Sequence, residues 1–373
     1  MSKSYTPGLK VLKNTSLSKD RLLPLKGDVH VKEGEFVKSD VIVASTAIPG
    51  NVHMLNIANE LNIDPKQILD CMIVKEEEKV SKGQMIAQNK GLFGLFKNEV
   101  KSPIDGQIIN ISKVTGQVVI SEKPLPINID AYIPGKVINI YKNEGILINA
   151  VGTFIQGIIG IGGEQKGIIE TLVQNPSDKI NSSMIDNNLK NKIIICGSYI
   201  DYEIYNKAQE VGVKGIVCGG VDYNTISKIL GYSLGVAITG TEKAVTLILT
   251  EGFGEIDMAE RTFNLLKNNE GKIASINGAT QIRAGVLRPE IFIESDTNKK
   301  SQEISEQDLI ISEGSIVRII REPHFGKLGK ITKLPYELVK MKSETKVRVA
   351  EVKFDDNSKE IIPRANLEVI LSN

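Results

Sequence analysis

The sequence predicts a multidomain chain of mixed β and α/β class, and three observations support this prediction. The first 150 residues are dominated by strand signals and contain a motif that occurs twice. Residues 191–295 alternate short apolar strands with helices, which is typical of α/β domains. Residues 311–373 contain glycine-punctuated strands that predict a small β-barrel. A length of 373 residues suits two or three domains of about 100–200 residues each.

The composition is that of an ordinary soluble protein, with 41% apolar and 24% charged residues. The net charge of +1 excludes a global field that would attract nucleic acid or anionic membrane, so such binding needs a local patch. The N-terminus has no apolar signal region and no apolar run is as long as a membrane span. We therefore expect a cytoplasmic protein that does not contact a membrane.

Cysteines and histidines are few and scattered. Cys71, Cys196 and Cys218 form no C-x-x-C pair, which suits a reducing compartment. The three histidines do not cluster either, and a zinc site needs about three or four grouped ligands. We expect no metal and no cofactor.

Breaks in composition divide the chain into six segments. We expect an N-terminal arm (1–20), a β-rich domain (21–150), a glycine-rich connection and linker (151–190), an α/β domain (191–295), a linker (296–310) and a small β-barrel (311–373).

The β-rich domain is organised around residues 100–120. Ser102-Pro103 favours an extended entry, Asp105-Gly106 predicts a hairpin turn, and Thr115-Gly116 predicts a second turn. Residues 31–44 (VKEGEFVKSDVIVA) and 74–87 (VKEEEKVSKGQMIA) align without gaps, which indicates a duplicated unit. We interpret the two copies as parts of one pseudo-symmetric domain.

These turns and repeats resemble the barrel-sandwich hybrid fold of biotinyl and lipoyl domains. The resemblance implies two short four-stranded sheets packed face to face, with a modified lysine at a hairpin tip. The nearest lysines, Lys101 and Lys113, do not lie in the sequence context of such a modification site. We therefore expect a structural or docking role for this domain.

The glycine-rich stretch 153–167 allows two interpretations. It could hold a phosphate, but it matches neither the G-x-x-x-x-G-K-[ST] pattern nor a G-x-G-x-x-G that opens a helix. A tight turn between domains, with close approach of the backbone, is the other interpretation.

In the α/β domain we expect strands over 192–196, 215–218 and 236–239 and helices over 202–211, 225–230 and 258–268, forming a largely parallel sheet. Ligands bind such sheets at the carboxyl ends of the strands. Arg283 could instead pair with an acid such as Glu251 and fix the sheet edge. The residues that could form a ligand site are Ser198, Asp222, Thr239, Thr241, Glu251, Gln281 and Arg283.

The C-terminal segment resembles a KOW motif, the glycine-centred hairpin of small five-stranded barrels. The resemblance rests on Gly314, Val317, Gly326, Gly329 and Ile331. It implies contact with RNA, ribosomal components or other proteins through the glycine-bearing loop. A local basic cluster around this loop suits phosphate contacts, and its members are Arg318, Arg321, His324, Lys327, Lys330 and Lys333.

No catalytic constellation can be assembled from the sequence, because the α/β domain has neither a nucleophile elbow nor a histidine. We expect a non-enzymatic binding or adaptor protein that contacts RNA, a ribonucleoprotein or a large protein assembly through its KOW-like barrel. The alternative is an accessory or carrier subunit of a metabolic enzyme complex, with a small-molecule site at the strand ends. The sequence does not determine the partner or the oligomeric state.

Overall fold

The computed structural model describes residues 9–89, 98–232, 237–238, 245–281, 287–295, 311–319, 324, 327–341, 346–354 and 356–372. Over these residues the protein consists of several β-sheets with few helices. No described helix is long and apolar enough to cross a membrane. The linker expected over residues 296–310 lies outside the described residues.

One mixed sheet of sixteen strands runs through the body of the molecule. Its main path follows the order β14-β19-β17-β16-β15-β20-β22-β13-β1-β29-β23-β24-β27-β28, and β12 and β3 attach beside β13. The bounds are β1 (Leu9–Leu22), β3 (Phe36–Val37), β12 (Gly135–Tyr141), β13 (Gly145–Gln156), β14 (Ile159–Ile161), β15 (Glu164–Thr171), β16 (Lys192–Ile195), β17 (Gly215–Val221), β19 (Thr246–Phe253), β20 (Ile273–Asn277), β22 (Glu290–Glu294), β23 (Ile316–Ile319), β24 (Leu328–Lys333), β27 (Val349–Lys353), β28 (Lys359–Pro363) and β29 (Leu367–Ser372).

β1 connects the central and C-terminal parts of this sheet. It pairs antiparallel with β13 along most of its length and parallel with β29 near its start. Leu9, Val11 and Leu12 are buried. The expectation of an arm over residues 1–20 is therefore wrong from residue 9 onward. A strand that pairs on both sides is held by backbone hydrogen bonds, so it needs few apolar residues to be ordered.

The central unit (residues 159–294) is parallel at its centre and antiparallel at its margins. β15, β16, β17 and β19 pair parallel in that order, whereas β14 and β20 pair antiparallel with the outer two. Of the three strands expected in a parallel sheet, those over 192–196 and 215–218 are confirmed as β16 and β17, and β15 and β19 add to the parallel part. The helices between and after them are α3 (Tyr202–Val211), α4 (Tyr223–Leu230) and α5 (Glu260–Lys267).

Helix α3 begins and ends where the sequence predicts. The Asp201 side chain accepts a hydrogen bond from the backbone N–H of Ile204 at 2.9 Å, which satisfies a donor of the first turn. Gly212 ends the helix in the left-handed conformation, which glycine adopts without steric penalty.

Two expectations for the central unit are wrong. The strand predicted over 236–239 is β18 (Ala237–Ile238), which pairs with β21 (Thr280–Gln281) in a separate sheet. The end of the expected linker, around 175–189, is folded onto the core. It contains the 3₁₀ turns η2 (Ser182–Met184) and η3 (Asn187–Leu189), and its residues Ile180, Ile185 and Leu189 are buried.

The glycine-rich stretch is used for close backbone approach. A Cβ on Gly160 would lie 2.6 Å from the carbonyl oxygen of Gly278 and 2.6 Å from Pro289 Cβ. Only glycine fits such a contact without displacement of the neighbouring chain. This geometry agrees with the tight-turn interpretation of residues 153–167.

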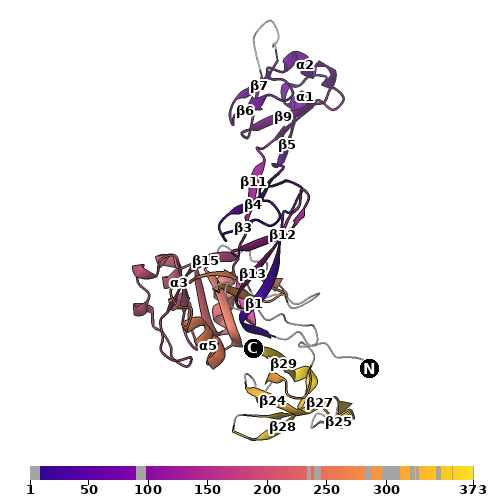
Figure 1. The fold of residues 1–373 in the computed structure, drawn as a ribbon. Helices are drawn as coiled ribbons and strands as arrows, with labels where there is room; N and C mark the ends of the chain where they lie inside the picture. The colour runs from indigo at the N-terminus through magenta and orange to yellow at the C-terminus, as the bar shows by residue number, and fades with distance from the viewer. Residues whose placement is uncertain are drawn as a thin grey trace.

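The N-terminal part consists of two units joined in series (Figure 1). The proximal unit (residues 28–48 and 125–141) lies against the body, and the distal unit (residues 52–121) projects beyond it, inserted between β4 and β11. Besides β3 and β12, the proximal unit contains β2 (Asp28–Val29), β4 (Ile42–Ile48) and β11 (Leu125–Asp130). The distal unit contains β5 (Val52–Asn56), α1 (Ile57–Leu61), η1 (Pro65–Gln67), α2 (Ile68–Cys71), β6 (Lys79–Val80), β7 (Met85–Gln88), β8 (Glu99–Lys101), β9 (Gly106–Ile111) and β10 (Gln117–Ser121).

Each copy of the repeated motif belongs to a different unit and packs into a different hydrophobic cluster. Val31, Val37 and Val43 are buried in one hydrophobic cluster, and Val74, Val80 and Ile86, at the aligned positions, are buried in another. The hydrogen bonds also repeat, since the backbone N–H of Lys32 donates to Glu35 Oε2 and that of Lys75 to Glu78 Oε2, both at 2.9 Å. The duplication is therefore structural, but it gives two units in series instead of one pseudo-symmetric domain.

One of the two predicted turns in residues 100–120 closes a hairpin. β9 and β10 pair antiparallel on either side of Gly116, which has a φ of 66°. The turn at Asp105-Gly106 does not, because β8 pairs with β7 while β9 pairs with β6 and β10. The chain passes from one small sheet to another at this point.

The C-terminal unit (residues 311–372) is a five-stranded antiparallel arrangement in the order β29-β23-β24-β27-β28. A short pair, β25 (Val339–Lys340) and β26 (Lys346–Val347), and the turn η5 (Arg364–Asn366) complete it. One side of the sheet carries Val317, Ile331 and Val352, which are buried. The other side faces the central unit and solvent, and it carries the candidate site.

Candidate functional site

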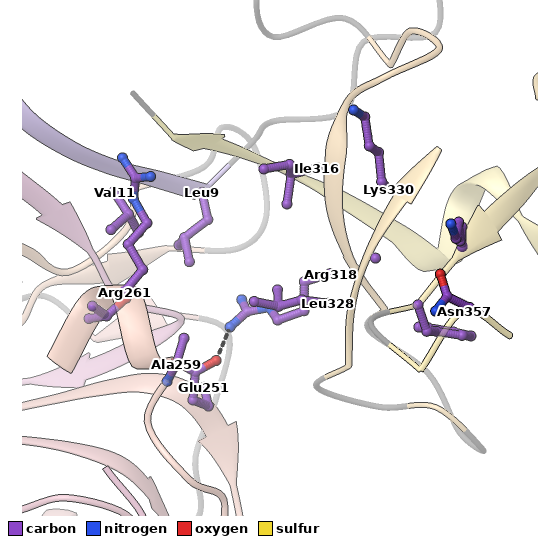
Figure 2. A pocket seen from close by; sticks show the side chains of 14 residues that line it. Leu9, Val11, Glu251, Ala259, Arg261, Ile316, Arg318, Leu328, Lys330 and Asn357 are labelled. Carbon is purple, nitrogen blue, oxygen red and sulfur yellow. Dashed lines mark hydrogen bonds and ion pairs between the residues drawn. The ribbon is translucent and has the colours of Figure 1, made fainter. Parts of the chain in front are cut away.

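A pocket of about 530 Å³ lies where the C-terminal unit meets β1 and α5 (Figure 2). On the side of the body its walls are Leu9 and Val11 from β1, Glu251 from β19, Ala259 before α5, and Arg261 and Thr262 from α5. The C-terminal unit contributes Ile316, Arg318, Leu328, Lys330, Lys353 and Asn357. Pockets of about 300–1,000 Å³ between domains are typical ligand sites, so this pocket is large enough for a small organic group.

The floor of the pocket continues into an exposed row of three lysines. Lys330 on β24 lies directly opposite Lys353 on β27, and Lys353 lies opposite Lys359 on β28. Directly opposed residues of antiparallel strands project from the same face, and neighbouring strands are about 4.8 Å apart. All three side chains are exposed. We call Lys330, Lys353 and Lys359 the lysine row.

Only one member of the lysine row has an acidic partner among the described residues. Lys359 Nζ lies 2.9 Å from Glu351 Oε1. Glu351 also accepts a hydrogen bond from Thr332 Oγ1 at 2.6 Å. The hydrogen bond from Thr332 has the largest effect on the Glu351 carboxyl and, together with the contact to Lys359, lowers its pKa. Lys330 and Lys353 form no ion pair with a described residue. Like charges opposed across strands are destabilising, so a bound anion would stabilise this face.

The loop residues predicted for the basic cluster lie around Phe354. Lys327 Nζ is 5.6 Å from the centre of the Phe354 ring, and the His324 ring is 5.4 Å from the same ring. Lys333 lies opposite Glu351, which offsets its charge. Lys327 and Lys330 are thus the loop and strand cations next to the pocket. Arg321 lies outside the described residues.

Arg318, also predicted for the exposed basic cluster, is instead buried, with 2% of its surface accessible. Its guanidinium donates to Glu251 Oε2 and to Glu368 Oε2, both at 2.6 Å. Arg288 donates to the other oxygen of Glu368. Burial would lower the pKa of Arg318, but the two carboxylates more than offset it and the pKa is raised. Arg318 thus fixes the C-terminal unit to β19 and is not a surface contact.

Glu251, predicted for the ligand site at the strand ends, belongs to this ion network. Its second oxygen, Oε1, accepts a hydrogen bond from the backbone N–H of Ala259 at 2.9 Å, just before α5. Arg283, the partner considered for Glu251, lies outside the described residues, and Glu251 pairs with Arg318. The reason is that Glu251 lies inside β19, where its side chain faces the C-terminal unit.

Two other predicted strand-end residues, Ser198 and Asp222, form hydrogen bonds within the protein. The Ser198 hydroxyl donates to the carbonyls of Ser177 and Asp178, and Ser198 is buried. Asp222 accepts a hydrogen bond from the Tyr199 hydroxyl at 2.5 Å, and burial with this contact raises the pKa of Tyr199 to about 12. Backbone also fills the strand ends, since a Cβ on Gly219 would lie 2.0 Å from the Ile256 carbonyl.

The remaining predicted ligand residues add nothing to that site. Gln281 lies in the separate pair formed by β18 and β21. Thr239, Thr241 and Arg283 lie outside the described residues. Ser198 therefore has a structural role, since its hydroxyl binds backbone carbonyls, and Asp222 is exposed at the surface.

Sequence reasoning missed three cations of the site, Lys353, Lys359 and Arg261. A signal existed for two of them, because Lys353 and Lys359 flank the turn-forming stretch Phe354–Ser358 at equal distance from its centre. Hairpin register then places them opposite each other. No comparable signal existed for Arg261, which reaches the pocket from a different unit.

The site can hold an anion by charge and an apolar group by burial. Among the described residues no group of three His, Cys, Asp or Glu side chains could bind a metal ion. No protein-family model matches this chain, and neither does any curated protein.

Proposed function

We propose that this chain is a non-enzymatic binding protein that holds the phosphate backbone of RNA on the lysine row of its KOW-like C-terminal unit. The observation that supports the proposal is the register of Lys330, Lys353 and Lys359, with two of the three lacking an acidic partner among the described residues. Lysines with no carboxylate to neutralise them are the side chains that exchange counterions for phosphates. Lys327 extends the same charge toward the loop.

In this proposal the N-terminal units are a docking arm that resembles a duplicated barrel-sandwich hybrid. The distal unit projects from the body (Figure 1), so a protein partner could contact it without covering the lysine row. The ion pairs of Arg318 hold the C-terminal unit, and with it the lysine row, on the central unit.

The test is a fluorescence-anisotropy titration with single-stranded and duplex RNA at two salt concentrations. The double variant Lys330→Ala, Lys353→Ala should bind more weakly and with less salt dependence. Each phosphate contact with a single strand contributes about 0.7 to the slope of log K against log salt, so losing two contacts should reduce it by about 1.4. The matched control is Lys79→Ala, Lys82→Ala, which removes the same charge from exposed positions of the distal unit.

Three results decide the proposal. A loss confined to the Lys330, Lys353 variant supports it. Equal losses in both double variants would mean that binding follows total charge and not the row, and would contradict it. Absence of RNA binding by the unaltered protein, with binding of an acidic protein to the same row, would replace RNA by a protein partner.

A further inference from the structure

The lysine row and the pocket share two residues. Lys330 and Lys353 belong to the row by register and also line the pocket. A nucleic-acid strand whose phosphates lie on the row therefore passes the mouth of the pocket. From this continuity we infer that the pocket receives one unpaired base of that strand. The inference rests on the proposed function and adds to it a preference for single strands.

The pocket has the lining that a nucleobase requires. Ile316 and Leu328 on the C-terminal unit and Leu9 on β1 supply apolar surface for the faces of a base. Asn357 and Thr262 supply hydrogen-bonding groups for its edge. A nucleoside is smaller than the drug-sized ligands that pockets of this volume hold.

Cations approach the pocket from two sides. Figure 2 shows Arg261 beside Val11 on one side and Lys330 on the other. The planar guanidinium of arginine stacks on bases, whereas lysine acts as a point charge for phosphate. The arrangement thus separates the two tasks, with phosphates on the lysine row and the base between α5 and the C-terminal sheet.

A duplex cannot use the pocket. Its bases are paired and stacked, and taking one out requires about a few kcal/mol. Duplex RNA should therefore contact only the lysine row. The expected signature is tighter binding of a single strand than of a duplex of the same length, and the difference should disappear when the pocket wall is removed.

The experiment uses the full chain, a twelve-nucleotide oligouridine and a matched RNA duplex. Ile316→Ala removes an apolar wall of the pocket and leaves every cation in place. Ile361→Ala is the control, because Ile361 has nearly the same exposure, 44% against 41% for Ile316, lies on a strand of the same sheet and does not line the pocket. Ile316→Ala removes apolar surface that a bound base would cover, so it should weaken oligouridine binding about five-fold.

A second measurement needs no variant. Oligouridine carrying 4-thiouridine is crosslinked to the unaltered protein with long-wavelength light, and the linked peptides are identified by mass spectrometry. A base in the pocket should crosslink to residues 259–262 before and at the start of α5, as well as to the C-terminal unit. Phosphate contact with the lysine row alone brings no base to α5.

The outcomes separate this inference from the proposed function. Weaker oligouridine binding by Ile316→Ala alone, with duplex binding unchanged and crosslinks to α5, supports it. Equal affinity for single strand and duplex, no effect of Ile316→Ala and crosslinks confined to the C-terminal unit would overturn it while the phosphate-binding function stands. No binding of either RNA by the unaltered protein would overturn the proposed function itself.

Discussion

Replacing Arg318 by methionine should weaken the attachment of the C-terminal unit to the central unit. The guanidinium makes three contacts, to Glu251, Glu368 and the Thr250 carbonyl. In the variant Glu368 keeps its ion pair with Arg288, whereas among the described residues Glu251 keeps only the backbone N–H of Ala259. One buried carboxylate is then left without a counter-charge, for which the loss of stability is about 3–5 kcal/mol.

Native-state hydrogen exchange followed by mass spectrometry measures this loss locally, which is needed because a chain of several units does not unfold in one step. Amides of β23 and β29, which pair with each other, should exchange at least about a hundred-fold faster, since 1.36 kcal/mol corresponds to one decade. Adding Glu251→Gln to Arg318→Met should recover part of the protection, because it removes the unpaired charge.

The control is Lys359→Met, which makes the same type of change in an exposed ion pair, with 51% of the lysine side chain accessible. Exposed pairs contribute at most about 1 kcal/mol, so exchange in β23 and β29 should change little. If Arg318→Met altered their exchange by less than about ten-fold, the ion network would not be what holds the C-terminal unit, and the fixed-position argument would fail.

Two further predictions concern the same sheet. Glu351→Gln should free Lys359 from its ion pair, strengthen RNA binding and raise the salt slope by about 0.7 in anisotropy titrations; an unchanged slope would mean that Lys359 does not touch phosphate. Gly329→Ala should destabilise the C-terminal unit, measured by hydrogen exchange, because its Cβ would lie 2.4 Å from Val352 Cγ1; unchanged exchange would show that the sheet accommodates the methyl group.

The sequence predicted well wherever the deciding contacts are local. The cap at Asp201 and the left-handed Gly212 determine α3 from within a few residues. The repeats at 31–44 and 74–87 carry their own turns and side-chain hydrogen bonds, so self-similarity alone revealed them. The position of Lys353 opposite Lys359 is also local, because the short turn between the two residues determines it.

The expectations that were wrong depend on contacts between distant segments. The partners of Arg318 are 67 and 50 residues away, and nothing near an arginine in an alternating strand indicates that a carboxylate from another unit will cover it. The sequence of β1 resembles that of a polar arm. The strand is ordered because its backbone pairs with β13 and β29, which are distant in the sequence. Gly329 does not have a positive φ, and it is needed for close packing against Val352.

The duplicated motif offers a prediction with an internal control. Gly34 and Glu77 occupy the same position in the two copies, and both have positive φ, 84° and 67°. The backbone N–H of Gly34 donates to Val137 and that of Glu77 to Ile108, so the two turns are held in the same way. They differ in that glycine adopts this conformation freely, whereas a residue with a Cβ pays about 1–2 kcal/mol.

Glu77→Gly and Gly34→Ala should therefore have opposite effects on the two units. In Glu77→Gly the relief of backbone strain exceeds the cost of the larger unfolded-chain entropy by a small margin. Gly34→Ala introduces the strain and should destabilise the proximal unit by about 0.5–1 kcal/mol. The reporters are the amides of Ile108 and Val137, which donate across the two turns to Glu78 and Glu35. Exchange at Ile108 should slow in Glu77→Gly, and exchange at Val137 should quicken in Gly34→Ala. Because the two cores are separate clusters, neither change should reach the other reporter. A shift of both reporters in either variant would mean that the proximal and distal units open together.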